Sequence, residues 1–150
     1  MYPLLAALLM PLGLVWGLSL FSARFPFRWT NVCKLELSVL FLLIGIVGHL
    51  LYPESVVELI PSWFPLRLFS SYATGVLEIA FAILLWTRHA RSTSLIIIIY
   101  LILVLPFNIY GWTIASNSIN YLDNPNYLWL RIPLQALFIA FAYIAGRPAK

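Results

Sequence analysis

Long apolar runs separated by short polar segments constrain this chain more than any other feature. Five runs cover approximately residues 2–21, 35–52, 69–86, 94–112 and 127–144. Each is long enough, or nearly so, for a helix to cross a hydrocarbon core that takes roughly 20 residues. The runs are continuously apolar and do not alternate, which favours helices over the strands of a membrane barrel.

Composition decides whether water or lipid surrounds these helices. Hydrophobic residues make up 63% of the chain and charged residues 9%, against about 45–50% and about 25% in ordinary soluble domains. We therefore expect an all-α integral membrane protein, a four-helix transmembrane bundle plus one extra N-terminal transmembrane helix. The expected segments are an N-terminal helix at 1–22, a basic cytoplasmic loop at 23–34, the four-helix domain at 35–146 and a cytoplasmic tail at 147–150.

The first run is expected to be a retained helix. No Lys or Arg precedes its apolar stretch, Pro3 and Pro11 interrupt it, and residues 21–23 do not resemble the small-residue cleavage site of a secretory signal. A cleaved or peripheral leader is the alternative.

Basic residues predict the orientation, because cytoplasmic loops collect Lys and Arg. Five spans place seven basic residues on one side and two on the other. The N-terminus is therefore expected outside and the C-terminus in the cytoplasm, as in a multi-pass protein of a cell (inner) membrane. The seven are Arg24, Arg28, Lys34, Arg88, Arg91, Arg147 and Lys150, and the two are Arg67 and Arg131. Topology and anionic lipid account for the net charge of +4 without nucleic acid.

The single cysteine and the two histidines limit the chemistry. Cys33 is expected in the basic cytoplasmic loop, without a partner for disulfide exchange. His49 and His89 are expected on opposite sides of the membrane, which argues against a haem held by both. The sequence contains no zinc spacing, phosphate-binding loop, dinucleotide fingerprint or covalent haem motif.

The outer segment after the second run predicts a short helix. Pro53 suits a first helical turn, and Glu54 and Glu58 lie near the start of that helix. We expect the helix to end before Pro61. It is either an interfacial anchor or a lid over a pocket that opens outward.

Polar residues inside the apolar runs are the candidate functional residues. A charge at mid-membrane costs about 2.5–3.5 kcal/mol on insertion scales and is tolerated mainly when it faces the bundle interior. Following each run places several polar groups at a similar depth near the outer face, where they are expected to form one cluster. They are His49, Thr74, Glu78, Asn108, Arg131 and Gln135.

Glu78 is the leading candidate, because a buried carboxyl either pairs with Arg131 or His49 or takes up a proton. A protonated Glu78 could donate to the carbonyl of a bound lipophile. The alternative is a purely structural network, in which Asn108 and Gln135 join helices.

The order and spacing of short motifs resemble the DoxX-type membrane proteins over about residues 35 to 145. The motifs are Gly48-His49-Leu50, Thr74-Gly75-Val76-Leu77-Glu78, Leu105-Pro106-Phe107-Asn108 and Leu130-Arg131-Ile132-Pro133-Leu134-Gln135. The resemblance implies a four-helix bundle and a link to quinones or redox assemblies, but no single reaction. The extra first run departs from the family pattern.

Two functions follow as hypotheses, and whether the chain is an enzyme stays open. In the first, a redox-linked, oxidoreductase-associated protein binds a quinone or similar lipophile, with Glu78, His49 and Arg131 as the reactive groups. Ligand-binding residues would be Asn108, Gln135, Thr74, Trp112 and Trp129. In the second, the chain is a non-catalytic subunit or scaffold for a protein partner or a second copy, with a structural polar cluster.

Overall fold

The computed structural model describes residues 28–115 and 126–148, and these residues are helical with no strand. The predicted first span, at residues 2–21, lies outside them. In chain order the elements are α2 (Trp29–Leu43), η1 (Ile44–Leu51), α3 (Pro53–Val57), α4 (Arg67–Leu84), α5 (Ala90–Ala115) and α6 (Asn126–Ala145). The segment η1 is π-helical and continues α2 without a break.

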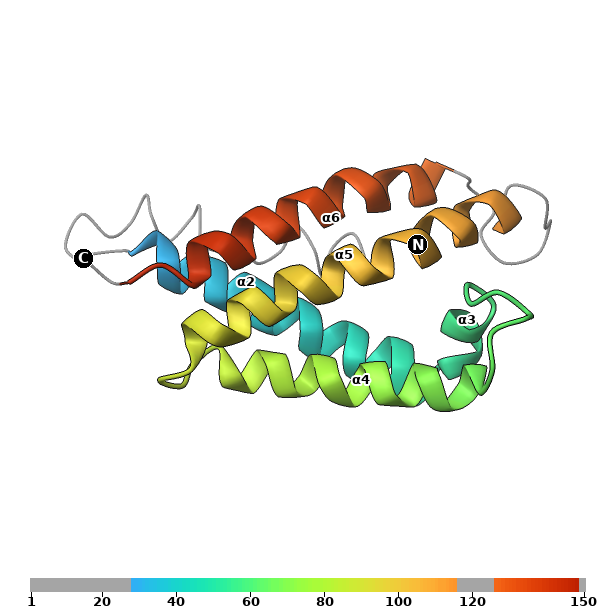
Figure 1. Ribbon diagram of the computed structural model, residues 1–150, viewed down its shortest axis with the longest axis horizontal. Coiled ribbons are helices and arrows are strands. Elements are labelled where there is room, and N and C mark those ends of the chain that lie inside the picture. Colours follow the sequence, from blue (N-terminus) through green and yellow to red (C-terminus); the bar gives the residue numbers. More distant parts are fainter. Residues whose placement is uncertain (1–27, 116–125, 149–150) are drawn as a thin grey trace.

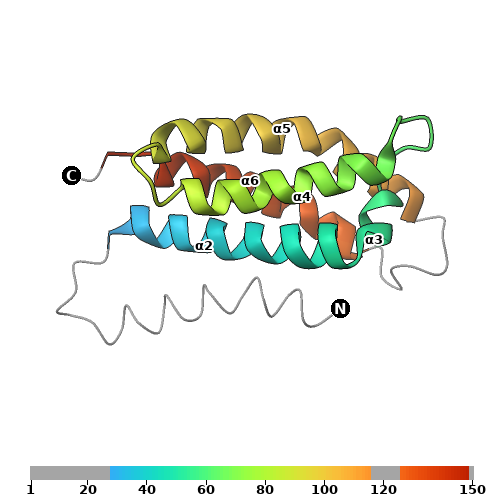
Figure 2. The ribbon, with the colours of Figure 1, turned by 90° about the horizontal axis from the view of Figure 1, so that it is seen from below.

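The long helices lie side by side in an elongated antiparallel bundle (Figure 1). The helix α2, with η1, packs against both α4 and α6, while α5 packs mainly against α6. A short turn joins α4 to α5 at the end of the bundle where α2 begins and α6 ends (Figure 2). The short helix α3 lies at the opposite end, against η1 and α4.

Three of the helical segments are long and apolar enough to cross a membrane. They are Trp29–Leu51, Arg67–Leu84 and Ala90–Gly111, and a shorter apolar stretch covers Ile132–Ala145. Large apolar side chains point outward along them, for example Leu95, Ile99 and Leu103 on α5. Such a surface suits lipid, since water would not solvate it. The predicted all-helical class is confirmed for the described residues, and three of their helices have the length and composition of membrane spans.

The N-terminal boundary of α2 corrects the predicted loop at 23–34. The helix already begins at Trp29, so Cys33 is not a loop residue: it is 2% exposed and belongs to the core. Cys33, Leu37 and Phe41 recur at four-residue spacing, which continues one buried stripe of the helix. The buried stripe thus continues into the segment that was predicted as a loop.

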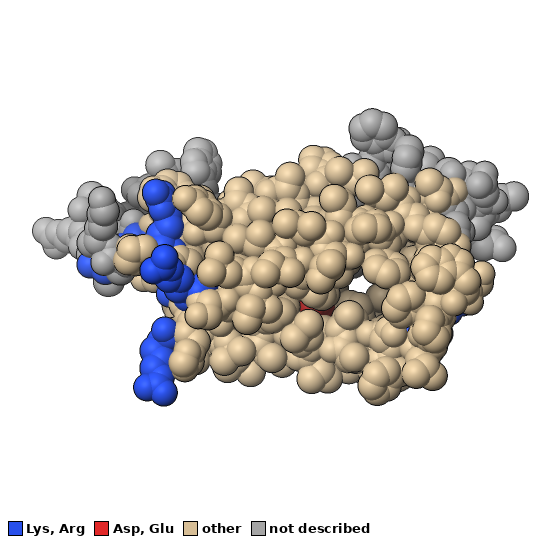
Figure 3. Space-filling view, in the orientation of Figure 1, with Lys and Arg blue, Asp and Glu red and all other residues tan. Residues whose placement is uncertain are grey.

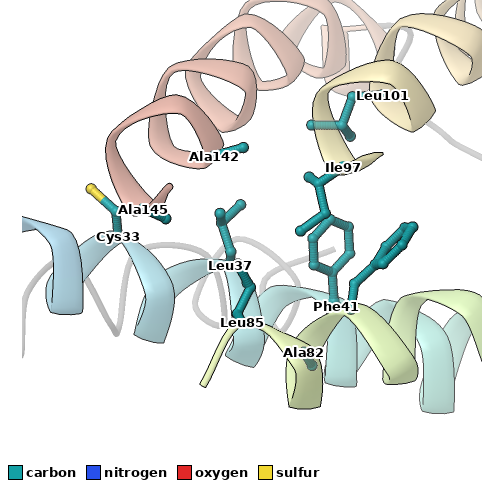
Figure 4. Packing of buried hydrophobic residues seen from close by; sticks show 10 residues of the cluster. Cys33, Leu37, Phe41, Ala82, Leu85, Ile97, Leu101, Ala142 and Ala145 are labelled. Atoms are coloured by element: carbon teal, nitrogen blue, oxygen red, sulfur yellow. The ribbon is translucent and has the colours of Figure 1, made fainter. Parts of the chain in front are cut away.

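The apolar core occupies the half of the bundle where α4 turns into α5. Phe41 and Leu37 of α2 meet Leu85 of α4 and Ile97 of α5, with Ala142 of α6 closing the group (Figure 4). The rings of Phe41 and Phe81 pack edge to face at 5.8 Å. Buried polar side chains lie both near this core and beyond it. Ser38, Thr93 and Ser94 are at the core's end of the bundle, whereas His49 and Ser71 lie toward α3.

Candidate functional site

Five polar side chains meet where η1, α4 and α5 come together, and we call them the polar cluster. One comes from η1, three come from α4, which η1 crosses closely, and one comes from the middle of α5. The members are His49, Ser71, Thr74, Glu78 and Tyr100.

Glycines bring η1 close enough to α4 for this cluster to form. A Cβ on Gly75 would lie 2.5 Å from the Cβ of His49, and a Cβ on Gly45 would lie 2.9 Å from the Gly75 carbonyl oxygen. Neither position has room for a side chain. Gly45 and Gly75 thus allow the two helices to pack closely, whereas Gly48 faces Val56 of α3 instead of α4.

The hydrogen bonds of His49 define which ring nitrogen carries a proton. Its Nδ1 lies 3.2 Å from Ser71 Oγ and 3.1 Å from Thr74 Oγ1. The Thr74 hydroxyl lies 2.9 Å and 2.8 Å from the carbonyl oxygens of Ser70 and Ser71, and its one proton goes to them. It can therefore only accept from His49. Nδ1 carries a proton, and in the neutral ring Nε2 offers a lone pair.

The Glu78 carboxyl lies between His49 and Tyr100. Its Oε1 accepts a hydrogen bond of 2.7 Å from the Tyr100 hydroxyl. Its Oε2 lies 3.6 Å from His49 Nε2 and is buried without a hydrogen-bond partner among the described groups. The whole residue is 5% exposed. The position of one proton thus decides the charge of this pair. On His49 Nε2 it gives a charged pair, and on Glu78 Oε2 it leaves both side chains neutral.

Asn108 and Gln135 form a second, separate polar contact between α5 and α6. Asn108 Nδ2 donates 3.0 Å to Gln135 Oε1, and Gln135 Nε2 donates to the Leu101 carbonyl oxygen. The predicted single cluster is thus divided into two groups in the described residues. Tyr100 and Asn108 are eight residues apart on α5, which is about 12 Å along a helix, so their levels differ.

Three of the predicted site residues cannot be placed by their side chains. The side chains of Trp112, Trp129 and Arg131 lie outside the described part of the structure, although the helices that carry them, α5 and α6, are described. The predicted pairing of Arg131 with Glu78 stays a prediction. The described partners of Glu78 are Tyr100 and His49.

Sequence reasoning missed Ser71 and Tyr100. Tyr100 lies in the middle of an apolar run, away from the ends where interfacial aromatic residues gather. That position was the available signal for a buried phenol with a hydrogen-bond partner. Ser71 is fully buried and lies three residues before Thr74, so the two share a face of α4.

The segment between α3 and α4 covers the end of the bundle beside the polar cluster. The ring of Phe64 packs against Phe107 of α5 at 5.5 Å, and Leu59 fills the space next to Gly111. Arg67 at the start of α4 donates to the Val57 carbonyl oxygen at the end of α3. The predicted short helix is confirmed as Pro53–Val57, with Pro53 in its first turn. These contacts make the segment a cover over this end of the bundle, and its role as an interfacial anchor stays a prediction.

The described residues hold no group of three or more His, Cys, Asp or Glu side chains arranged for a metal ion. The polar cluster instead offers one carboxyl, one imidazole and three hydroxyls inside an apolar bundle. Such a set can donate and accept hydrogen bonds and move a proton between Glu78 and His49.

Comparison with known proteins gives one match. A family described as Domain of unknown function (DUF8561) matches residues 37–145, the stretch that runs from the middle of α2 to the end of α6. No curated protein and no solved structure matches the chain.

Proposed function

This chain belongs to the DUF8561 family, and we propose that its polar cluster binds the hydrogen-bonding head of a membrane-dissolved lipophile. A quinone, or another molecule with a carbonyl group, has the required chemistry. Glu78 and His49 hold the head through hydrogen bonds, while Tyr100 and Thr74 keep the two residues in place.

The observation that carries the proposal is the state of Glu78 Oε2. This oxygen is buried and has no hydrogen-bond partner among the described groups. A buried polar atom without a partner is unfavourable by about 1–3 kcal/mol. A carbonyl oxygen that accepts a hydrogen bond from protonated Glu78, or a hydroxyl that donates to the ionised form, would remove that penalty.

The resemblance to DoxX-type proteins agrees with this proposal. It predicts a quinone or redox link and a four-helix bundle. The extra N-terminal helix departs from that family pattern and is predicted from the apolar run at residues 2–21. All of these stay predictions. A multi-pass protein of a cell (inner) membrane, with the polar cluster nearer the outer face, is part of the same proposal.

The test is mass spectrometry of organic extracts from protein purified in native-lipid discs. Wild type is expected to contain a lipophile other than bulk phospholipid in stoichiometric amount, and Glu78→Gln is expected to lose it. Glu36→Gln is the matched control, because Glu36 is also a buried carboxyl with an unpaired oxygen, but lies on α2 away from the cluster. Equal lipophile content in wild type and Glu78→Gln would refute the proposal.

A scaffold role is the second candidate, and the Asn108–Gln135 contact favours it. This amide pair satisfies both groups and joins α5 to α6, as polar residues do when they only stabilise helix association. A scaffold predicts that Glu78→Gln lowers thermal stability while the extract of wild type contains only bulk phospholipid. In that case the outer segment or the first run would be expected to bind a protein partner.

A further inference from the structure

An opening lies in the face of the bundle beside the polar cluster. The helices α4 and α5 share a turn at one end and diverge toward the other (Figure 1). Between them the surface shows a small hollow, with acidic colour visible near it (Figure 3). Glu78 of α4 and Tyr100 of α5 face each other across this space, because the Tyr100 hydroxyl donates to Glu78 Oε1.

Side-chain contacts close both ends of the space between α4 and α5. At the end toward the apolar core, Tyr100 donates to Glu78 and its ring packs against Phe81 at 5.4 Å. At the far end, Phe64 covers Phe107, and Leu59 lies against Gly111. A molecule arriving from the water at that end would have to displace the cover.

Val104 is the α5 residue that lies between these two closed ends. Val104 follows Tyr100 by four residues and precedes Phe107 by three, so all three share one face of the helix. Its neighbour Leu103 is 65% exposed on the outer surface of α5. The wall of the opening on the α5 side is thus apolar and continuous with the surface that faces lipid.

We propose that the opening between α4 and α5 admits the ligand sideways from the bilayer. The ligand is then a lipophile with a hydrogen-bonding head, which reaches Glu78 and His49, and an apolar tail, which stays against α4 and α5 among the lipid chains. This inference rests on the proposed function of the polar cluster and adds the route and the two-part chemistry of the ligand.

The experiment uses a benzoquinone with a decyl tail that carries a photoreactive diazirine, added to the full chain in lipid discs. Val104→Trp fills the opening and is expected to lower covalent labelling about tenfold, equivalent to about 1.4 kcal/mol of binding free energy. Leu103→Trp adds the same bulk one residue away, on the lipid-facing surface, and is expected to label like wild type. Thermal unfolding shows whether each variant is folded.

Mapping of the labelled peptides in the wild type needs no substitution and decides the question if Val104→Trp does not fold. Labels on α4 and α5 are expected, and labels confined to α2 and α6 would overturn the route. Unchanged labelling of folded Val104→Trp, together with lost labelling of Glu78→Gln, would also overturn the route but leave the binding site standing. Unchanged labelling of Glu78→Gln would refute the proposed function itself.

Discussion

Tyr100 is the side chain that connects Glu78 to the rest of the bundle. Its hydroxyl donates to Glu78 Oε1, and its ring packs against both Phe41 and Phe81. The hydroxyl is thereby fixed by the aromatic part of the core. Glu78 keeps one oxygen satisfied and the other directed at His49, so the position of the carboxyl depends on a residue that is not itself charged.

Tyr100→Phe is expected to lower the free energy of unfolding by about 1 kcal/mol, the usual range for one polar contact between membrane helices. The ring contacts stay, so the loss reports the hydrogen bond alone. Reversible unfolding in mixed micelles measures it. Tyr72→Phe on the outer face of α4 is the control and should have no effect. Equal stability of Tyr100→Phe and wild type would show that the Glu78 contact contributes nothing.

The crossing of η1 and α4 depends on two glycines and on the wider turn of a π-helix. A π-helix often occurs at functional positions, because it rotates side chains out of the regular helical register. Here His49 lies within η1 and meets α4 at the level of Gly75, where no side chain intervenes.

Gly75→Ala is expected to separate η1 from α4 and to lower stability by about 1–3 kcal/mol, the usual result of overpacking. The added methyl group would meet the His49 Cβ at 2.5 Å and the Gly45 carbonyl oxygen at 3.0 Å. Gly48→Ala meets its neighbours at 3.7 Å and 3.9 Å and is the matched control. Thermal unfolding of both variants tests this, and equal loss in both would contradict the steric explanation.

The start of α4 contains a backbone conformation that is unfavourable for its residue. Leu66 precedes the helix with φ 53° and ψ 43°, the left-handed region, which costs a residue with a Cβ roughly 1–2 kcal/mol. Leu66→Gly is therefore expected to raise the free energy of unfolding by about 1 kcal/mol. Leu68→Gly, two residues later and inside the helix, should lower it by a similar amount. Denaturant titration of both compares them directly, and a destabilised Leu66→Gly would contradict the expectation.

The described Lys and Arg side chains are unevenly distributed along the bundle. They gather at the end where α4 turns into α5, and the face seen in Figure 3 shows almost none between the two ends. Arg28, Arg88, Arg91 and Arg147 are exposed there. The distribution agrees with a cytoplasmic position for this end, next to anionic lipid.

The orientation is tested by labelling single cysteines in intact cells with a membrane-impermeant maleimide. Ser62→Cys lies in the cover between α3 and α4, and Ser92→Cys lies at the basic end; both positions are exposed. In a Cys33→Ala background, Ser62→Cys is expected to react at once and Ser92→Cys only after the cells are permeabilised. The reverse pattern would place the basic end outside.

For the described residues, the sequence by itself determined the helical class, the approximate positions of the long helices and the short helix that begins at Pro53, and it placed Glu78, His49 and Thr74 in one polar cluster. These follow from local properties: hydropathy over about 20 residues, proline geometry and the high cost of a polar group in lipid. The predicted helix boundaries were less accurate, because α2 already begins at Trp29. Its buried stripe includes Cys33, which lies before the apolar run that hydropathy defines.

Only the tertiary structure decided how the polar residues are grouped. It joined Glu78 to Tyr100 and His49, and it separated Asn108 and Gln135 into a contact of their own. The depth of a residue along a span can be estimated from its residue number. Which neighbouring helix its side chain contacts depends on how the helices pack. Two glycines and a π-helical segment set that packing here, and none of their effects is visible in any one helix alone.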